Sequence, residues 1–154
     1  MSVSSFSDIA EEFTKRVDRI VWCTVATVDE KGRPMSCLLH PIWEGSTGWI
    51  LTFRESAKAQ RIDANPYVSL SYWDQEHQQV YAECKAQFID DADEKARLWD
   101  LFKNTPEPMG YDPALFFENV SSPAFGALKL TPWRVELFAL SDLVEGKGAQ
   151  TWIP

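Results

Sequence analysis

The chain has 154 residues, of which 45% are hydrophobic and 25% are charged, and its net charge is −8. These values are typical of one globular domain with its own core, so we expect residues 1–154 to form a single domain and exclude a disordered chain or a coiled coil. The acidic balance argues against a nucleic-acid partner. No apolar run is long enough to span a membrane and the first residues lack a signal-peptide pattern, so we expect a cytoplasmic protein without a membrane partner.

The cysteines and histidines do not form a metal-binding pattern. Cys23, Cys37 and Cys84 lie far apart without a CxxC pair, and neither His40 nor His77 lies at a ligand spacing from another candidate. A structural zinc ion needs four clustered Cys or His ligands. We therefore expect buried thiols and no metal site.

The pattern of apolar residues predicts groups of strands separated by helices. Phe6, Ile9, Phe13 and Val17 share one helical face, which predicts an amphipathic helix over residues 6–17. Similar reasoning predicts helices at 56–64 and from 90 to about 103, and strands at 20–28, 34–43, 49–53, 67–73, 80–89, 127–130 and 133–140. Turn residues between the first three strands favour a meander. Six or seven mostly antiparallel strands indicate a mainly β (α+β) fold, a small barrel with helices at its rim.

One strand-to-helix junction has the residues of an anion site. A strand is expected to end at Phe53, and Ser56 can cap the helix that follows, which leaves free amides that attract phosphate. Thr52 and Ser56 add hydroxyl groups, and Lys58 lies in the first turn, where a cation opposes the helix dipole unless an anion accompanies it. Five basic residues face only two acidic ones between residues 31 and 61. A plain cap followed by a solvated lysine explains the same pattern equally well.

Four segments, in this order and at this spacing, make the sequence similar to the FMN-binding split barrels. This family comprises the proteins related to pyridoxamine 5′-phosphate oxidase, including the general-stress flavoproteins. The segments are Thr-Val-Asp-Glu-Lys-Gly-Arg-Pro at 27–34, Thr52 with Ser56-Ala57-Lys58, Asn-Pro-Tyr-Val at 65–68, and Gln79-Val80. The resemblance covers residues 18–103 well and the closing strands to residue 140 loosely. It implies a split β-barrel and a homodimer with FMN at the subunit interface.

The resemblance also implies which residues bind the cofactor. The second strand would lie along the flavin ring, Thr52, Ser56 and Lys58 would hold the phosphate, and Gln79 would contact the flavin from another strand. Phe138 stands where relatives often have a tryptophan near the ring. The residues of the second strand that match are Ser36, Cys37, Leu38 and Leu39.

The sequence departs from the family pattern at two of these positions. The family usually has a phosphate-binding arginine near position 36, where this chain has Ser36. This difference is expected to weaken phosphate binding unless Arg33 or Arg54 takes the place of the missing arginine. Ala57 replaces a second basic residue that many relatives have. These departures leave open a barrel that has lost its ligand.

The expected activity is that of a flavin-dependent oxidoreductase acting on a small-molecule redox substrate. The flavin supplies the redox chemistry, so no acid–base pair is required. The family's Arg-x-His-x-Arg substrate segment is missing from residues 141–148, so vitamin B6 oxidation is not expected. His40 is a proton donor near the ring or a structural residue, and Cys37 is a redox thiol or a packing residue. The alternatives are a non-catalytic flavin-binding or stress-response protein, and a deazaflavin- or haem-binding member of the same fold.

Overall fold

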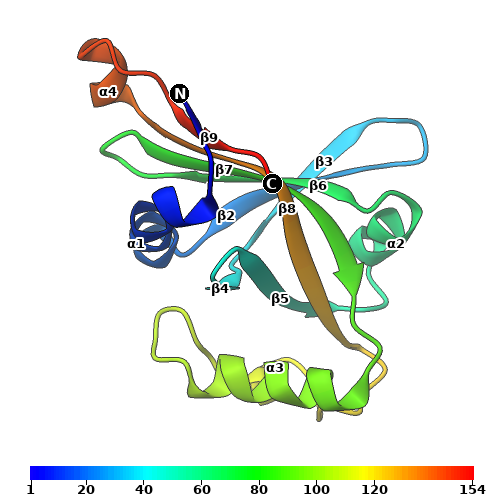
Figure 1. Cartoon of the computed structure of the whole chain (residues 1–154). Helices are drawn as coiled ribbons and strands as arrows, with labels where there is room; N and C mark the ends of the chain where they lie inside the picture. Colours follow the sequence, from blue (N-terminus) through cyan, green and yellow to red (C-terminus); the bar gives the residue numbers. More distant parts are fainter.

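The computed structural model describes all 154 residues, which form one nine-stranded sheet with helices around it (Figure 1). Seven strands follow each other in the order β1-β9-β8-β7-β6-β2-β3, while β5 pairs with β8 and β4. The strands are β1 (Ser2–Val3), β2 (Cys23–Val28), β3 (Pro34–Leu39), β4 (Ile42–Glu44), β5 (Thr47–Phe53), β6 (Tyr67–Trp73), β7 (Gln78–Phe88), β8 (Phe125–Ala139) and β9 (Gln150–Trp152).

Four α-helices and two 3₁₀ turns complete the chain. They are α1 (Ala10–Ile20), α2 (Ala57–Ala64), α3 (Ala92–Asn104) and α4 (Leu140–Val144), with 3₁₀ turns at Phe6–Asp8 and Pro113–Leu115. In Figure 1, α1 and α2 lie on opposite sides of the barrel, α3 crosses its lower end, and α4 sits at the tip of an arm formed by the last strands. None of the helices is both long and apolar enough to cross a membrane.

The prediction of a mainly β split barrel is confirmed, but the structure contains short strands that the sequence did not reveal. Pro41 follows β3 and separates it from β4, so the expected strand 34–43 is two strands. Conversely, the two expected closing strands are one strand, β8, which continues through Pro132. The neighbouring residues Glu83 and Cys84 of β7 lie opposite Arg134 and Pro132, so Trp133 is an extra residue in β8 and the ladder is irregular next to the proline. The other two strands that were not predicted are β1 and β9 near the two ends of the chain, and they pair with each other in parallel.

The expected meander of the first three strands is only partly correct. β2 pairs with β3 as an antiparallel hairpin, and β4, at the end of the expected second strand, pairs with the start of β5. The long partner of β5 is β8 instead of β3, with Leu51 opposite Ala127. The chain therefore leaves one half of the sheet after β3 and enters the other half. The space between β3 and β5 stays open at their ends, and this opening is where the main pocket lies.

The interior consists of two cores. The larger has 20 buried residues and includes Phe13 and Val17 of α1 and the inward side chains of the strands. The smaller has eight buried residues and joins Leu98 and Phe102 of α3 to β5 and β8. Cys23 and Cys84 are buried in the larger core, as expected, and burial raises the pKa of the Cys23 thiol to about 12.

Candidate functional site

The larger of the two principal pockets, here called the main pocket, has a volume of about 620 Å³ and opens between the ends of β3 and β5. The start of α2 and the segment 107–117 complete its wall. Four of the predicted site residues line it, namely Leu38, Leu39, Thr52 and Lys58. A volume of this size is in the range of small-molecule and cofactor sites.

The beginning of α2 has the geometry of an anion site. Ser56 caps the helix as predicted, because its Oγ accepts a hydrogen bond of 3.2 Å from the amide of Ala59. The amides of Ala57 and Lys58 donate to no protein atom. Lys58 is half-buried in the pocket wall and forms no ion pair. Two free amides and one ammonium group therefore face no anion of the protein itself.

The two hydroxyl groups of this junction have different surroundings. The hydroxyl of Ser56 donates its hydrogen bond to the carbonyl of Phe53 at 2.8 Å, so its proton is already bonded within the protein. Thr52 is buried next to Gly126 of β8, where an added Cβ would lie 2.7 Å from the Thr52 carbonyl oxygen. The glycine thus allows the close approach of the strands that places Thr52 in the pocket wall.

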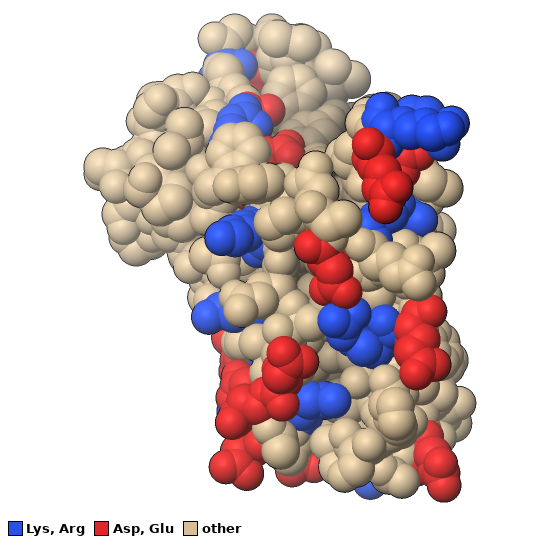
Figure 2. Space-filling view, turned by 90° about the vertical axis from the view of Figure 1, so that its right-hand side faces the viewer, with Lys and Arg blue, Asp and Glu red and all other residues tan.

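Neither arginine expected to replace the missing one at position 36 lines the main pocket. The guanidinium of Arg54 pairs with Asp63 at 2.8 Å, and that of Arg33 pairs with Asp29 at 2.7 Å. Arg33 instead lines a separate hollow of about 300 Å³, here called the basic hollow, together with Lys31 and Arg61. Figure 2 shows acidic and basic side chains interspersed on the side of the molecule that carries α2, without a broad basic area.

Ser36 and Cys37 lie on β3 but outside the main pocket. Ser36 is exposed opposite Ala26. Cys37 is half-buried and packs against the larger core, and its Sγ lies 3.9 Å from the carbonyl oxygen of Val25. This position favours packing over redox chemistry for the Cys37 thiol.

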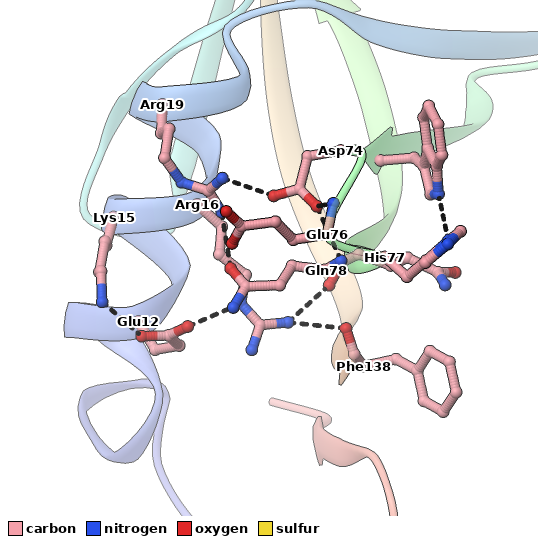
Figure 3. A network of polar contacts seen from close by, with 11 residues as sticks. Glu12, Lys15, Arg16, Arg19, Asp74, Glu76, His77, Gln78 and Phe138 are labelled. Carbon is pink, nitrogen blue, oxygen red and sulfur yellow. Dashed lines mark hydrogen bonds and ion pairs between the residues drawn. The ribbon is translucent and has the colours of Figure 1, made fainter. Parts of the chain in front are cut away.

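Gln79 and Phe138 are brought together, but away from the main pocket. They are direct partners in the ladder between β7 and β8. Figure 3 shows how the buried Arg16 of α1 holds this pair: its Nη1 donates to the carbonyls of Gln79 at 3.0 Å and Phe138 at 2.8 Å, and its Nε donates to Glu12 at 2.8 Å. The Oε1 of Gln79 also accepts a hydrogen bond from the hydroxyl of Tyr81.

Four predicted residues share one face of the sheet, here called the outer face. Ser36 and Leu38 belong to it on β3, and Gln79 and Phe138 belong to it on β7 and β8, because directly opposed residues point to the same side. Between them, β2 and β6 contribute the small side chains of Thr24, Ala26, Ser69 and Ser71, with the exposed Trp73 at the end of β6. Leu38 is 66% exposed and belongs to both the outer face and the main pocket.

The sequence reasoning missed the aromatic residues Trp22, Tyr111 and Phe116 of the pocket wall. His40, which the sequence offered as a proton donor or a structural residue, lies in the same wall, and its ring packs edge-on against Trp22 and Tyr111, with centroids 4.7 and 5.3 Å apart. Burial lowers the pKa of His40, although a contact of 3.1 Å between its Nε2 and the Met109 carbonyl opposes this shift. The only sequence signal was the unusual density of aromatic residues in a proline-containing loop.

Comparison with known proteins identifies the family of the chain. A family model described as pyridoxamine 5′-phosphate oxidase matches residues 9–139. No curated protein is significantly similar to the chain in sequence.

Solved structures with the same fold carry different descriptions. A protein related to general stress protein 26 from Clostridium acetobutylicum has a TM-score of 0.73 at 16% identity, with 95% of this chain and 94% of that one covered. A pyridoxamine 5′-phosphate oxidase-related, FMN-binding protein from Nostoc punctiforme has a TM-score of 0.60 at 18% identity, with 90% and 86% covered. A haem storage protein from Vibrio cholerae has a TM-score of 0.62 at 16% identity, with 85% and 94% covered. At these identities the likeness is one of fold.

Proposed function

The chain belongs to the pyridoxamine 5′-phosphate oxidase family, and on this basis we propose that it binds FMN in the main pocket and acts as a flavin-dependent oxidoreductase. The observation that carries the proposal is the beginning of α2. There Lys58 has no ion-pair partner and its amide has no acceptor, at the wall of a pocket large enough for a cofactor.

The residues present fit the group. The amide and the Nζ of Lys58 would hold the phosphate, and Leu38 and Leu39 would offer an apolar wall to the ring. The absent arginine near position 36 leaves Lys58 as the only basic side chain in this wall, since Arg33 and Arg54 are already paired. FMN would supply the hydride or single-electron transfer, and the protein would position the cofactor and its substrate.

We also propose that the site is completed by a second copy of the chain. Gln79 and Phe138 lie outside the main pocket of their own chain, but they share the outer face with Leu38, which lines that pocket. The small residues in the middle of this face allow a second sheet to approach closely. A two-fold pairing of outer faces would bring Gln79 and Phe138 of one subunit towards the pocket of the other.

Replacing Lys58 tests the phosphate assignment. Lys58→Ala removes the one ammonium group that the pocket offers to a phosphate, so it is expected to weaken FMN binding by about 10- to 100-fold, as is usual for a charge-assisted hydrogen bond. Riboflavin lacks the phosphate, and its affinity should stay nearly constant. Quenching of flavin fluorescence on titration measures both dissociation constants.

The matched control is Lys31→Ala, which removes a lysine from the basic hollow and should leave FMN affinity unchanged. Equal weakening of FMN and riboflavin by Lys58→Ala would remove the phosphate assignment. A protein that is colourless as purified and does not quench added FMN would contradict the cofactor itself.

A non-catalytic flavin carrier remains the second candidate, because residues 141–148 lack the substrate segment of the pyridoxamine phosphate oxidases. Stopped-flow mixing of the FMN-loaded protein with NADH and NADPH separates the two functions. The oxidoreductase is expected to bleach the flavin absorption and to recover it in air at a useful rate. A carrier would do neither.

A further inference from the structure

The segment between α3 and β8 places a rigid tyrosine in the wall of the main pocket. The amide of Tyr111 donates to the carbonyl of Phe102 in α3 at 3.0 Å. The preceding Gly110 is buried so closely that an added Cβ would lie 1.8 Å from the Thr105 carbonyl oxygen. The Tyr111 ring packs edge-on against Phe102 and Phe116 with centroids 5.5 Å apart in both pairs. Backbone and ring are therefore both fixed before any ligand binds.

The hydroxyl of this tyrosine has no partner in the protein. Burial raises the pKa of Tyr111 to about 12, and no hydrogen bond contributes to that shift. A polar group in a largely apolar wall gains a partner only from water or from a ligand. Nearby, the Nε2 of His40 contacts the Met109 carbonyl, which holds the imidazole ring against Trp22 and Tyr111. The result is a preorganised aromatic wall with one uncommitted hydroxyl group.

The charges of the pocket limit what this wall can bind. Lys58 and Glu107 are the charged side chains that line the pocket. In the proposed function Lys58 is neutralised by the phosphate of FMN, which leaves the carboxylate of Glu107. A second anion would be repelled by this carboxylate and by the phosphate, whereas neither an uncharged molecule nor a cation would be. The charges therefore exclude an anionic substrate.

We propose that the wall formed by Trp22, His40 and Tyr111 is the substrate subsite, and that it selects a non-anionic aromatic molecule with a hydroxyl or carbonyl group that hydrogen-bonds to the hydroxyl of Tyr111. This proposal rests on the proposed function for the place of FMN in the same pocket. The substrate class is a non-anionic aromatic molecule, whose ring packs against the edges and faces of the aromatic side chains and is oriented by one hydrogen bond.

Two probes of the same shape test the hydrogen bond. The first, 4-methylphenol, has one hydroxyl group, and the second, 1,4-dimethylbenzene, has a methyl group in its place. Equilibrium dialysis against the FMN-loaded protein gives both dissociation constants. Tyr111→Phe is expected to weaken 4-methylphenol by about 3- to 10-fold, the size of one neutral hydrogen bond, and to change the other probe by less than about twofold.

The matched control is Tyr67→Phe, which removes the hydroxyl of an exposed tyrosine on β6 outside the pocket and should change neither probe. Equal effects of Tyr111→Phe on both probes, or no binding of either probe to the FMN-loaded protein, would overturn the subsite. Loss of FMN itself in Tyr111→Phe would also overturn it, because the wall would then belong to the cofactor. A protein that takes up no FMN contradicts the proposed function instead, and the same dialysis without FMN still decides whether Tyr111 recognises the hydroxyl.

Discussion

His40 is half-buried in the main pocket between Trp22 and Tyr111, and burial lowers its pKa from the ordinary value of 6.5. The unfolded chain therefore binds this proton more readily than the folded one. The contribution to stability is fully present above pH 6.5 and is lost as the pH falls towards the lower pKa of the folded state. We expect the unfolding free energy of the His40→Phe variant to fall less between pH 7 and pH 5 than that of the original protein.

Urea denaturation at a series of pH values measures this slope. Identical slopes for the original protein and His40→Phe would show that the desolvation of His40 does not affect stability.

Site residues could be predicted from the sequence where their role depends on adjacent positions in the chain. Ser56 and Lys58 could be found because a cap and the first turn of a helix are set by a few adjacent positions. Tyr111 and Trp22 could not be found in this way, because they meet only through the path of a long loop. The assignments to Ser36, Gln79 and Phe138 came from the family resemblance and stay predictions.

The buried Arg16 joins two elements, α1 and the ladder of β7 and β8, through the three hydrogen bonds shown in Figure 3. Replacing it with methionine keeps the apolar stem but leaves two strand carbonyls and Glu12 without this donor. Arg16→Met is therefore expected to lower the unfolding free energy by about 2–4 kcal/mol. Urea denaturation measures the change.

Arg19, one turn later in α1, provides the comparison. Its side chain is 41% exposed and pairs with Asp74, so Arg19→Met is expected to cost less than about 1 kcal/mol. Equal costs for the two variants would mean that the strand carbonyls find other partners when Arg16 is removed.

Most elements were predicted within a few residues, because helix periodicity and β-branched runs are local signals. The errors arose where pairing decides the outcome. Pro132 was expected to separate two strands, but β8 continues through it, with an irregular register next to it. The pairing of β5 with β8 could not be predicted from turn residues, since it depends on which strand, distant in the sequence, has an edge free for pairing.

For the whole molecule, the outer face makes a specific prediction about assembly. Ser71 lies in the middle of this face between Thr24 and Tyr81, so an arginine there would hold two outer faces apart. We expect the original protein to be a dimer by sedimentation equilibrium and Ser71→Arg to be a folded monomer with weaker FMN binding. Circular dichroism checks that the variant is folded.

Ser121→Arg places the same charge on an exposed loop and should leave the dimer intact. The proposed pairing of outer faces is wrong if Ser71→Arg remains dimeric. It is equally wrong if the unaltered protein is monomeric at the concentrations at which it binds FMN.

The parallel pairing of β1 with β9 ties the beginning of the chain to its end. Ser2 and Val3 lie opposite Thr151 and Trp152, and the amide of Thr151 donates to the carbonyl of Met1 at 2.9 Å. Since β1 pairs with no other strand, fraying of β9 removes the only partner of β1, whereas β9 stays paired with β8 when β1 frays. A fusion tag or a trimming protease that disturbs β9 therefore also releases the beginning of the chain, but the same change at β1 leaves β9 attached to the sheet.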